Sequence, residues 1–172
     1  MTISAPRHSA PVATTFAGAA EAHLDDVFGY LLYLTRDRDL ADDLSGATFE
    51  KALRIWHRFD ARRGSARTWL LGIARTTALD WFRAEARRTR REQAAAPGEA
   101  EQAPFVEGLS PELEHALAAL SAAEREVLAL RVVLDLDGEA TARVLGVSPT
   151  AVSTRLSRAL KRLEERMSDD VG

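Results

Sequence analysis

The sequence contains no cysteine and few histidines, and these absences limit what the chain can do. Without cysteine among its 172 residues, the chain cannot form disulfides, use thiol catalysis or build a cysteine-type zinc site. It has no phosphate-binding glycine loop and no G-x-S-x-G string, which are the usual signatures of nucleotide and serine hydrolases. The four histidines lack metal-ligand spacing, so we expect no metal and no cofactor: His8, His23, His57 and His115. These absences favour a binding protein over an enzyme.

Long apolar segments are also missing. The apolar runs are short, as in residues 31–34 and 132–134, whereas a transmembrane helix needs about 20 apolar residues. Residues 1–15 contain no hydrophobic core of the kind found in signal peptides. With 46% hydrophobic and 28% charged residues, the composition predicts a soluble globular protein of the cytoplasm with no direct membrane insertion.

Charge is distributed unevenly along the chain. The formal net charge is only −3, but residues 51–91 carry 12 basic and 3 acidic groups, and residues 92–147 carry 3 basic and 11 acidic groups. Arginine supplies nearly all of the basic segment, and its planar guanidinium suits phosphates and base edges. The segment therefore indicates a nucleic-acid footprint, although a solvated helix face remains the alternative. Its arginines include Arg62, Arg63, Arg67, Arg75, Arg83, Arg87, Arg88, Arg90 and Arg91.

Apolar residues recur with helical period and there are almost no alternating β-branched runs, which predicts an all-α fold of two small helical domains. We expect the first domain at residues 16–91, after a disordered tail at residues 1–15. Residues 92–108 are rich in acid, alanine, proline and glycine without a periodic stripe, which is typical of a flexible acidic linker. The second domain is expected at residues 109–168.

The second domain shows the pattern of a helix-turn-helix. Ser121 and Glu124 fit a capping box, Gly146 marks a turn, and Ser148-Pro149 can cap the following helix. That helix has an apolar stripe and an outward face without acid up to Leu163, as expected of a helix that enters the DNA major groove. Residues of its first turns are placed for base edges, namely Thr150, Ser153, Thr154 and Arg155. Residues further along are placed for phosphates, namely Arg158, Lys161 and Arg162.

Several strings, in this order and spacing, resemble the sigma factors of bacterial RNA polymerase, within the extracytoplasmic-function (ECF) group of the sigma-70 family. Residues 40–44 with Thr48-Phe49 are similar to the helix of sigma region 2 that binds the polymerase clamp. Residues 69–75 are similar to the promoter-facing helix of that region. Sigma region 4 is resembled by residues 120–128, 145–148 and 158–163.

The resemblance implies a sigma factor that binds core RNA polymerase, directs it to promoters and helps to melt DNA. It implies polymerase contacts at Asp42, Asp43, Gly46 and Ala47, the last two standing where the family usually has a Gln-Glu pair. It implies minus-ten contacts at Arg62, Arg63, Arg67, Arg75, Thr76, Asp80, Arg83 and Arg87, with Thr76 where the family commonly has asparagine. The loop at residues 59–67 would receive an unstacked base, and the second domain would read the minus-thirty-five element. An anti-sigma factor is the implied inhibitory partner.

Two other readings stay open. The chain could be a two-domain helix-turn-helix transcription regulator that does not require core polymerase, or a helical enzyme acting on nucleic-acid phosphates. The enzyme lacks a convincing site, because the adjacent Asp42 and Asp43 point about 100° apart on a helix. We also expect no autoinhibitory domain before the first helical domain, and therefore expect the DNA-binding surfaces of the isolated chain to be uncovered.

Overall fold

The computed structural model describes residues 15–93 and 110–169, and it confirms the all-α prediction. Helices in the first part are α1 (Phe16–Thr35), α2 (Arg38–Ile55), the 3-10 turn η1 (Trp56–Arg58) and α3 (Ala66–Gln93). The second part contains α4 (Pro111–Ala118), α5 (Ala122–Leu128), the π-helical turn η2 (Ala129–Val133), α6 (Gly138–Leu145) and α7 (Pro149–Asp169). None of the described residues lies in a strand. Apart from Thr15, Glu92 and Gln93, the expected tail and linker lie outside these residues.

Side-chain caps fix most of the helix starts. Thr15 accepts a hydrogen bond from the Gly18 amide and Asp37 accepts one from the Leu40 amide, which begin α1 and α2. The capping box predicted for α5 is present, with Ser121 and Glu124 bonding each other's backbone amides. Gly146 ends α6 at a φ of 64°, in the left-handed region that favours glycine.

The first three helices form one unit. Helices α1, α2 and α3 pack against one another, and the fully buried side chains between them include Val27, Tyr30, Leu31, Leu70 and Leu71. At one end an aromatic cluster fills the space, with Trp56 stacked on Phe59 at 4.7 Å and edge-on to Trp69 at 5.5 Å between ring centroids. This cluster holds the loop between η1 and α3 against the helices.

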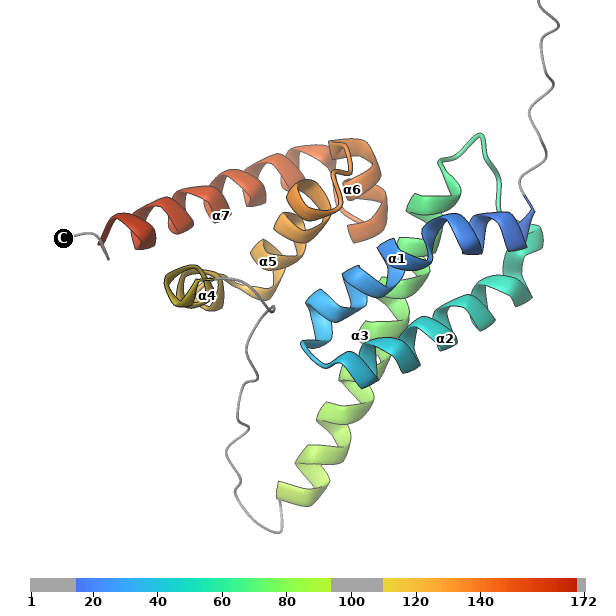
Figure 1. Ribbon diagram of the computed structural model, residues 1–172, viewed down its shortest axis with the longest axis horizontal. Coiled ribbons are helices and arrows are strands. Elements are labelled where there is room, and N and C mark those ends of the chain that lie inside the picture. Colours follow the sequence, from blue (N-terminus) through green and yellow to red (C-terminus); the bar gives the residue numbers. More distant parts are fainter. Residues whose placement is uncertain (1–14, 94–109, 170–172) are drawn as a thin grey trace, which may run out of the picture.

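Helices α4 to α7 form a second unit that rests on the first. Figure 1 shows α6 beside α3 while α7 extends along the far side of the second unit. Buried residues of both units belong to one apolar cluster, which runs from Leu31 and Leu70 to Val127 and Leu130. A smaller cluster inside the second unit contains Leu117, Leu120, Leu128 and Ala159. The two units therefore share an apolar interface.

Within residues 15–93 and 110–169, no helix is both long and apolar enough to cross a membrane.

Candidate nucleic-acid interface

The outward face of α7 carries the predicted recognition residues. Ser148 caps the helix by accepting a hydrogen bond from the Ala151 amide at 3.2 Å. Val152 and Ala159 are buried against the rest of the unit. The opposite face is exposed at Thr150, Ser153, Thr154, Arg158, Lys161 and Arg162, and half-buried at Arg155. The arrangement leaves the first turns of α7 accessible to a DNA groove.

Not every basic group on α7 has the same surroundings. Arg162 donates a hydrogen bond to the buried carboxylate of Glu124 at 2.9 Å, which ties the helix to the capping box of α5. Hydrogen bonds from Ser121, assisted by the charge of Arg162, outweigh burial and hold the pKa of Glu124 below its ordinary value. Arg162 therefore anchors α7 within the unit as well as adding positive charge to its surface.

A cleft of about 470 Å³ opens beside the loop that precedes α3. Trp69 and Thr76, both on α3, are among the residues that line it. Asp60 lies in the same wall and pairs with Arg62 at 3.0 Å, and this hydrogen bond lowers the pKa of Asp60. The cleft is large enough for a flat ring and has an arginine rim in Arg58 and Arg63.

A polar stripe continues from the cleft along α3. Thr76, Asp80, Arg83 and Arg87 follow one another at spacings of four, three and four, which places them on one helix face, and all four are exposed. Arg83 forms an ion pair with Asp80 at 3.3 Å. The cleft and this stripe together make a continuous surface of polar and basic groups.

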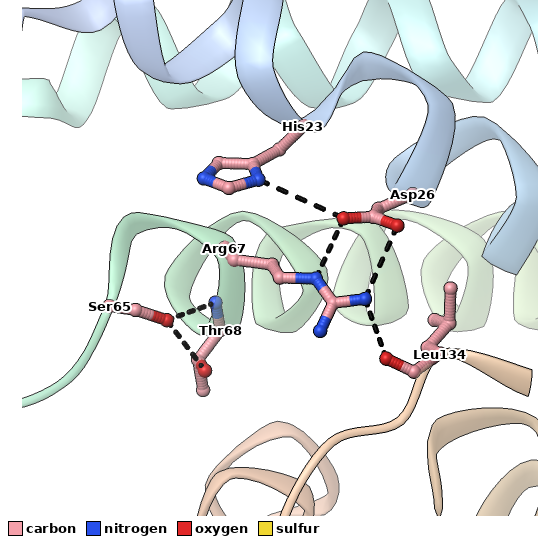
Figure 2. A network of polar contacts seen from close by, with 6 residues as sticks. All are labelled: His23, Asp26, Ser65, Arg67, Thr68 and Leu134. Atoms are coloured by element: carbon pink, nitrogen blue, oxygen red, sulfur yellow. Dashed lines mark hydrogen bonds and ion pairs between the residues drawn. The ribbon is translucent and has the colours of Figure 1, made fainter. Parts of the chain in front are cut away.

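Arg67 and Arg75 lie on another face of α3, against the second unit. Arg67 binds Asp26 at 2.7 Å and donates to the backbone oxygen of Leu134 at 2.6 Å; Figure 2 shows this contact. Arg75 forms a two-pronged hydrogen bond with Glu126 at 2.7 and 3.3 Å. The expectation of uncovered DNA-binding surfaces is therefore wrong for these two side chains in this arrangement.

Glu126 is the site residue that the sequence reasoning missed. It is 9% exposed, and Tyr30 donates a hydrogen bond to it at 2.7 Å. A signal was present, since Glu126, Leu130 and Leu134 follow one another at spacings of four and put an acid on an apolar face. Desolvation lowers the pKa of Arg75, but the hydrogen bond and charge of Glu126 outweigh it and raise that pKa overall.

The residues expected to bind polymerase form an exposed ridge on α2. Asp42, Asp43, Gly46 and Ala47 are all exposed, and their spacing places them on neighbouring positions of one face. A Cβ added at Gly46 would meet nothing within 4 Å. The ridge is therefore open to a partner, and the glycine is not required by packing.

Replacing Gly46 with alanine should stabilise the protein by up to about 1 kcal/mol, because glycine in a helix interior has greater backbone freedom to lose on folding. Chemical denaturation measures the change in the free energy of unfolding. The matched control is Ala47→Gly on the same ridge, which should lower the free energy of unfolding. A stabilising Ala47→Gly or a destabilising Gly46→Ala would contradict the placement of this ridge in an exposed helix.

Both units match family models. The Sigma-70 region 2 model matches residues 19–88, and the Sigma-70 region 4 model matches residues 110–163. The first range contains most of α1, all of α2 and most of α3, and the second contains α4 to most of α7. Region 2 precedes region 4 along the chain, as the sequence resemblance predicts.

Individual relatives agree with the family models. The chain is 35% identical over 144 residues to the ECF RNA polymerase sigma factor SigC of Mycobacterium tuberculosis (strain CDC 1551 / Oshkosh), covering 81% of this chain and 76% of that protein. It is 29% identical over 163 residues to the ECF sigma factor SigX of Bacillus subtilis (strain 168), covering 89% and 84%.

The fold is similar to a solved sigma factor. The sigma factor RpoE of Bartonella quintana, solved in complex with the anti-sigma factor NepR, has a TM-score of 0.73 and 24% identity, covering 89% of this chain and 96% of that chain. The two family models and the relative SigC confirm the family predicted from the sequence: this chain belongs to the ECF group of RNA polymerase sigma factors in the sigma-70 family.

Proposed function

We propose that this sigma factor binds core RNA polymerase through α2 and reads promoters with two separate surfaces. The observation that carries the proposal is the pair of surfaces itself: the cleft with its polar stripe on α3, and the exposed face of α7. In this proposal residues 16–91 bind polymerase and the minus-ten element, residues 92–108 connect the domains, and residues 109–168 read the minus-thirty-five element. No catalytic reaction is assigned to the chain, and it acts with polymerase in the cytoplasm.

The minus-ten element is assigned to the cleft and stripe of the first domain. Unstacking one base costs a few kcal/mol, which a pocket must recover by stacking and hydrogen bonding. Trp69 supplies an aromatic wall to the cleft and Arg63 supplies positive charge. Exposed Thr76, Arg83 and Arg87 continue the surface along α3 and would follow the backbone of the melted strand.

The polymerase contact is assigned to the α2 ridge of Asp42, Asp43, Gly46 and Ala47. The exposure of all four residues supports a docking role. We extend the proposal to an inhibitory anti-sigma factor, since the RpoE structure of similar fold was solved with one. Such a partner would compete with core polymerase if its footprint includes this ridge.

Run-off transcription with purified core polymerase tests the proposed function. We expect the protein to direct core enzyme to a defined set of promoters, and sequencing the transcript starts would identify both elements. Initiation no different from core enzyme alone would overturn the proposal. Tight sequence-specific binding by the isolated protein at physiological salt would instead favour the autonomous helix-turn-helix regulator.

Arg155→Ala and Arg158→Ala should affect promoter binding differently. Arg155 lies in the first two turns of α7, whereas Arg158 is exposed about one turn later. If Arg155 reads a base, its loss should weaken cognate sequences by about 1–3 kcal/mol and relax specificity. Loss of Arg158 should weaken all sequences and reduce the salt slope by about one.

Binding of the polymerase holoenzyme to promoters with cognate and scrambled minus-thirty-five elements, measured over a salt series, separates these effects. The control is Ser157→Ala, which alters an exposed neighbour on the same helix without removing charge. Equal losses on both promoters for both arginine variants would contradict the division between base and phosphate contacts.

A further inference from the structure

The second domain covers one face of α3 with an acidic side chain. The Glu126 carboxylate accepts hydrogen bonds from Arg75 Nε at 2.7 Å, from Arg75 Nη2 at 3.3 Å and from the Tyr30 hydroxyl at 2.7 Å. We propose that Glu126 is an internal competitor of promoter phosphate, which holds Arg75 in a closed arrangement of the two domains until the promoter complex forms. This inference rests on the proposed function, together with the minus-ten contact that the sequence resemblance implies for Arg75.

The geometry of Arg75 supports direct competition. A guanidinium binds a carboxylate and a phosphate with the same two-pronged set of hydrogen bonds. In the closed arrangement Glu126 takes both the Nε and Nη2 donors of Arg75, whose side chain is 22% exposed. A DNA phosphate therefore cannot use this pair of donors until Glu126 moves away.

Two more contacts close the same side of the first domain. Arg67 is also occupied, by the backbone oxygen of Leu134 and by Asp26. Arg143 of α6 lines the cleft proposed for the unstacked base and lies close to Gly64. A Cβ atom added to Gly64 would lie 3.7 Å from the Arg143 Nε. Contacts from α6 and from the segments on either side of η2 thus meet the side of the first domain that carries Arg67, Arg75 and the cleft.

The contact between the domains covers only some of the proposed binding surfaces. The α3 face with Arg67 and Arg75 is covered, whereas the recognition face of α7 and the polymerase ridge on α2 remain exposed. A closed chain could therefore still meet polymerase and duplex DNA while Arg67 and Arg75 are occupied. Polymerase would favour the open state if it binds the two domains farther apart.

The polar contact sets the alignment of an apolar interface. Tyr30 is 1% exposed and the Glu126 side chain 12% exposed, so the Tyr30 hydroxyl depends on Glu126 for its hydrogen bond, and Glu126 depends on Tyr30 and Arg75. Removing one partner of a buried charge strongly destabilises the arrangement that holds it, whereas the surrounding apolar contacts tolerate small shifts of one domain against the other. Neutralising Glu126 should consequently loosen the closed arrangement without removing the apolar core of either domain.

Distance measurements on the full chain test the closed arrangement directly. Because the sequence has no cysteine, Leu53→Cys and Ser157→Cys provide two exposed labelling sites, one in each domain, without further changes. Pulsed electron spin resonance should give one narrow distance distribution for the parent pair. Adding Glu126→Gln should broaden it toward longer distances, while the control Glu139→Gln, an exposed glutamate on α6, should leave it unchanged.

Binding to a forked promoter fragment with a single-stranded minus-ten element tests the competition. Without polymerase, Glu126→Gln should bind this DNA about three- to tenfold more tightly, because a larger fraction of the chain is open. Arg75→Ala should bind it more weakly than the parent, although it also removes the contact with Glu126. Tighter DNA binding by Glu126→Gln and weaker DNA binding by Arg75→Ala would distinguish competition from a purely structural role of the pair.

Each part of the proposal has a result that would overturn it. If Glu126→Gln proves unfolded by circular dichroism, Tyr30→Phe removes only the hydroxyl and should shift distance and affinity in the same directions. Unchanged distances in folded Glu126→Gln would overturn the closed arrangement, and an open variant with parental DNA affinity would overturn the competition. Failure of the parent protein to support run-off transcription is a separate result, which would overturn the proposed function instead.

Discussion

Replacing Leu130 with alanine should lower the free energy of unfolding by about 2–5 kcal/mol, the usual cost of a large cavity in a packed core. Leu130 is fully buried in the apolar cluster that contains residues of both domains, including Leu31 and Leu70. The loss should therefore spread beyond the domain in which the substitution is made.

Tryptophan fluorescence can detect this spread because all three tryptophans, Trp56, Trp69 and Trp81, belong to the first domain. In chemical denaturation of Leu130→Ala, the tryptophan transition should move to lower denaturant together with the helical signal. The control Val132→Ala lies two residues away, is 61% exposed and should change stability by less than about 0.5 kcal/mol. A tryptophan transition that stays at the parental midpoint would show that the domains unfold independently.

Local signals in the sequence were sufficient to predict most of the helices. The capping box at Ser121 and Glu124, the cap at Ser148 and the glycine turn at Gly146 all occur as expected, since each depends on residues three or four positions apart. The apolar stripes also predicted that α3 and α7 are long. Such local chemistry does not depend on how the domains meet.

The end of the helix beginning after Ser121 was not predictable in the same way. The apolar residues Val127, Leu128, Leu130 and Leu134 fit a single helix from the capping box to Leu134, but α5 ends at Leu128 and η2 continues as a π-helical turn. Val132 and Val133 are exposed there while Leu130 and Leu134 face the core. The π-helical turn contains an extra residue, which changes which side chains face inward. The helical period of the sequence does not predict such a turn.

For the candidate site, sequence could predict charge but not the partner of each charge. The arginine-rich segment correctly placed many basic groups on the loop and α3. Arg75 and Glu126 are 51 positions apart, and Arg67 and Leu134 are 67 apart, so their contacts depend on docking of the two domains. Tertiary packing therefore divides the arginines into exposed groups such as Arg83 and Arg87 and covered groups such as Arg67 and Arg75.

The protein should lose stability steeply above pH 10, through its only two tyrosines, Tyr30 and Tyr33 of α1. Burial, with the charge and hydrogen bond of Glu126, raises the pKa of Tyr30 well above 10.0. Burial also raises the pKa of Tyr33 to about 12, against the opposing charges of Arg125 and Arg36. The unfolded chain releases these protons near pH 10 while the folded chain retains them, so their contribution to stability is lost as pH rises toward 12.

For Tyr33 alone, the difference between the folded and unfolded pKa corresponds to about 3 kcal/mol lost between pH 10 and 12. Denaturation at a series of pH values measures the slope, and near-ultraviolet phenolate absorbance should appear together with unfolding. Tyr33→Phe cannot ionise and should show a shallower decline, with Tyr30→Phe reporting the second contribution. Phenolate absorbance rising near pH 10 while the helices remain folded would contradict the burial of both hydroxyl groups between α1 and its neighbours.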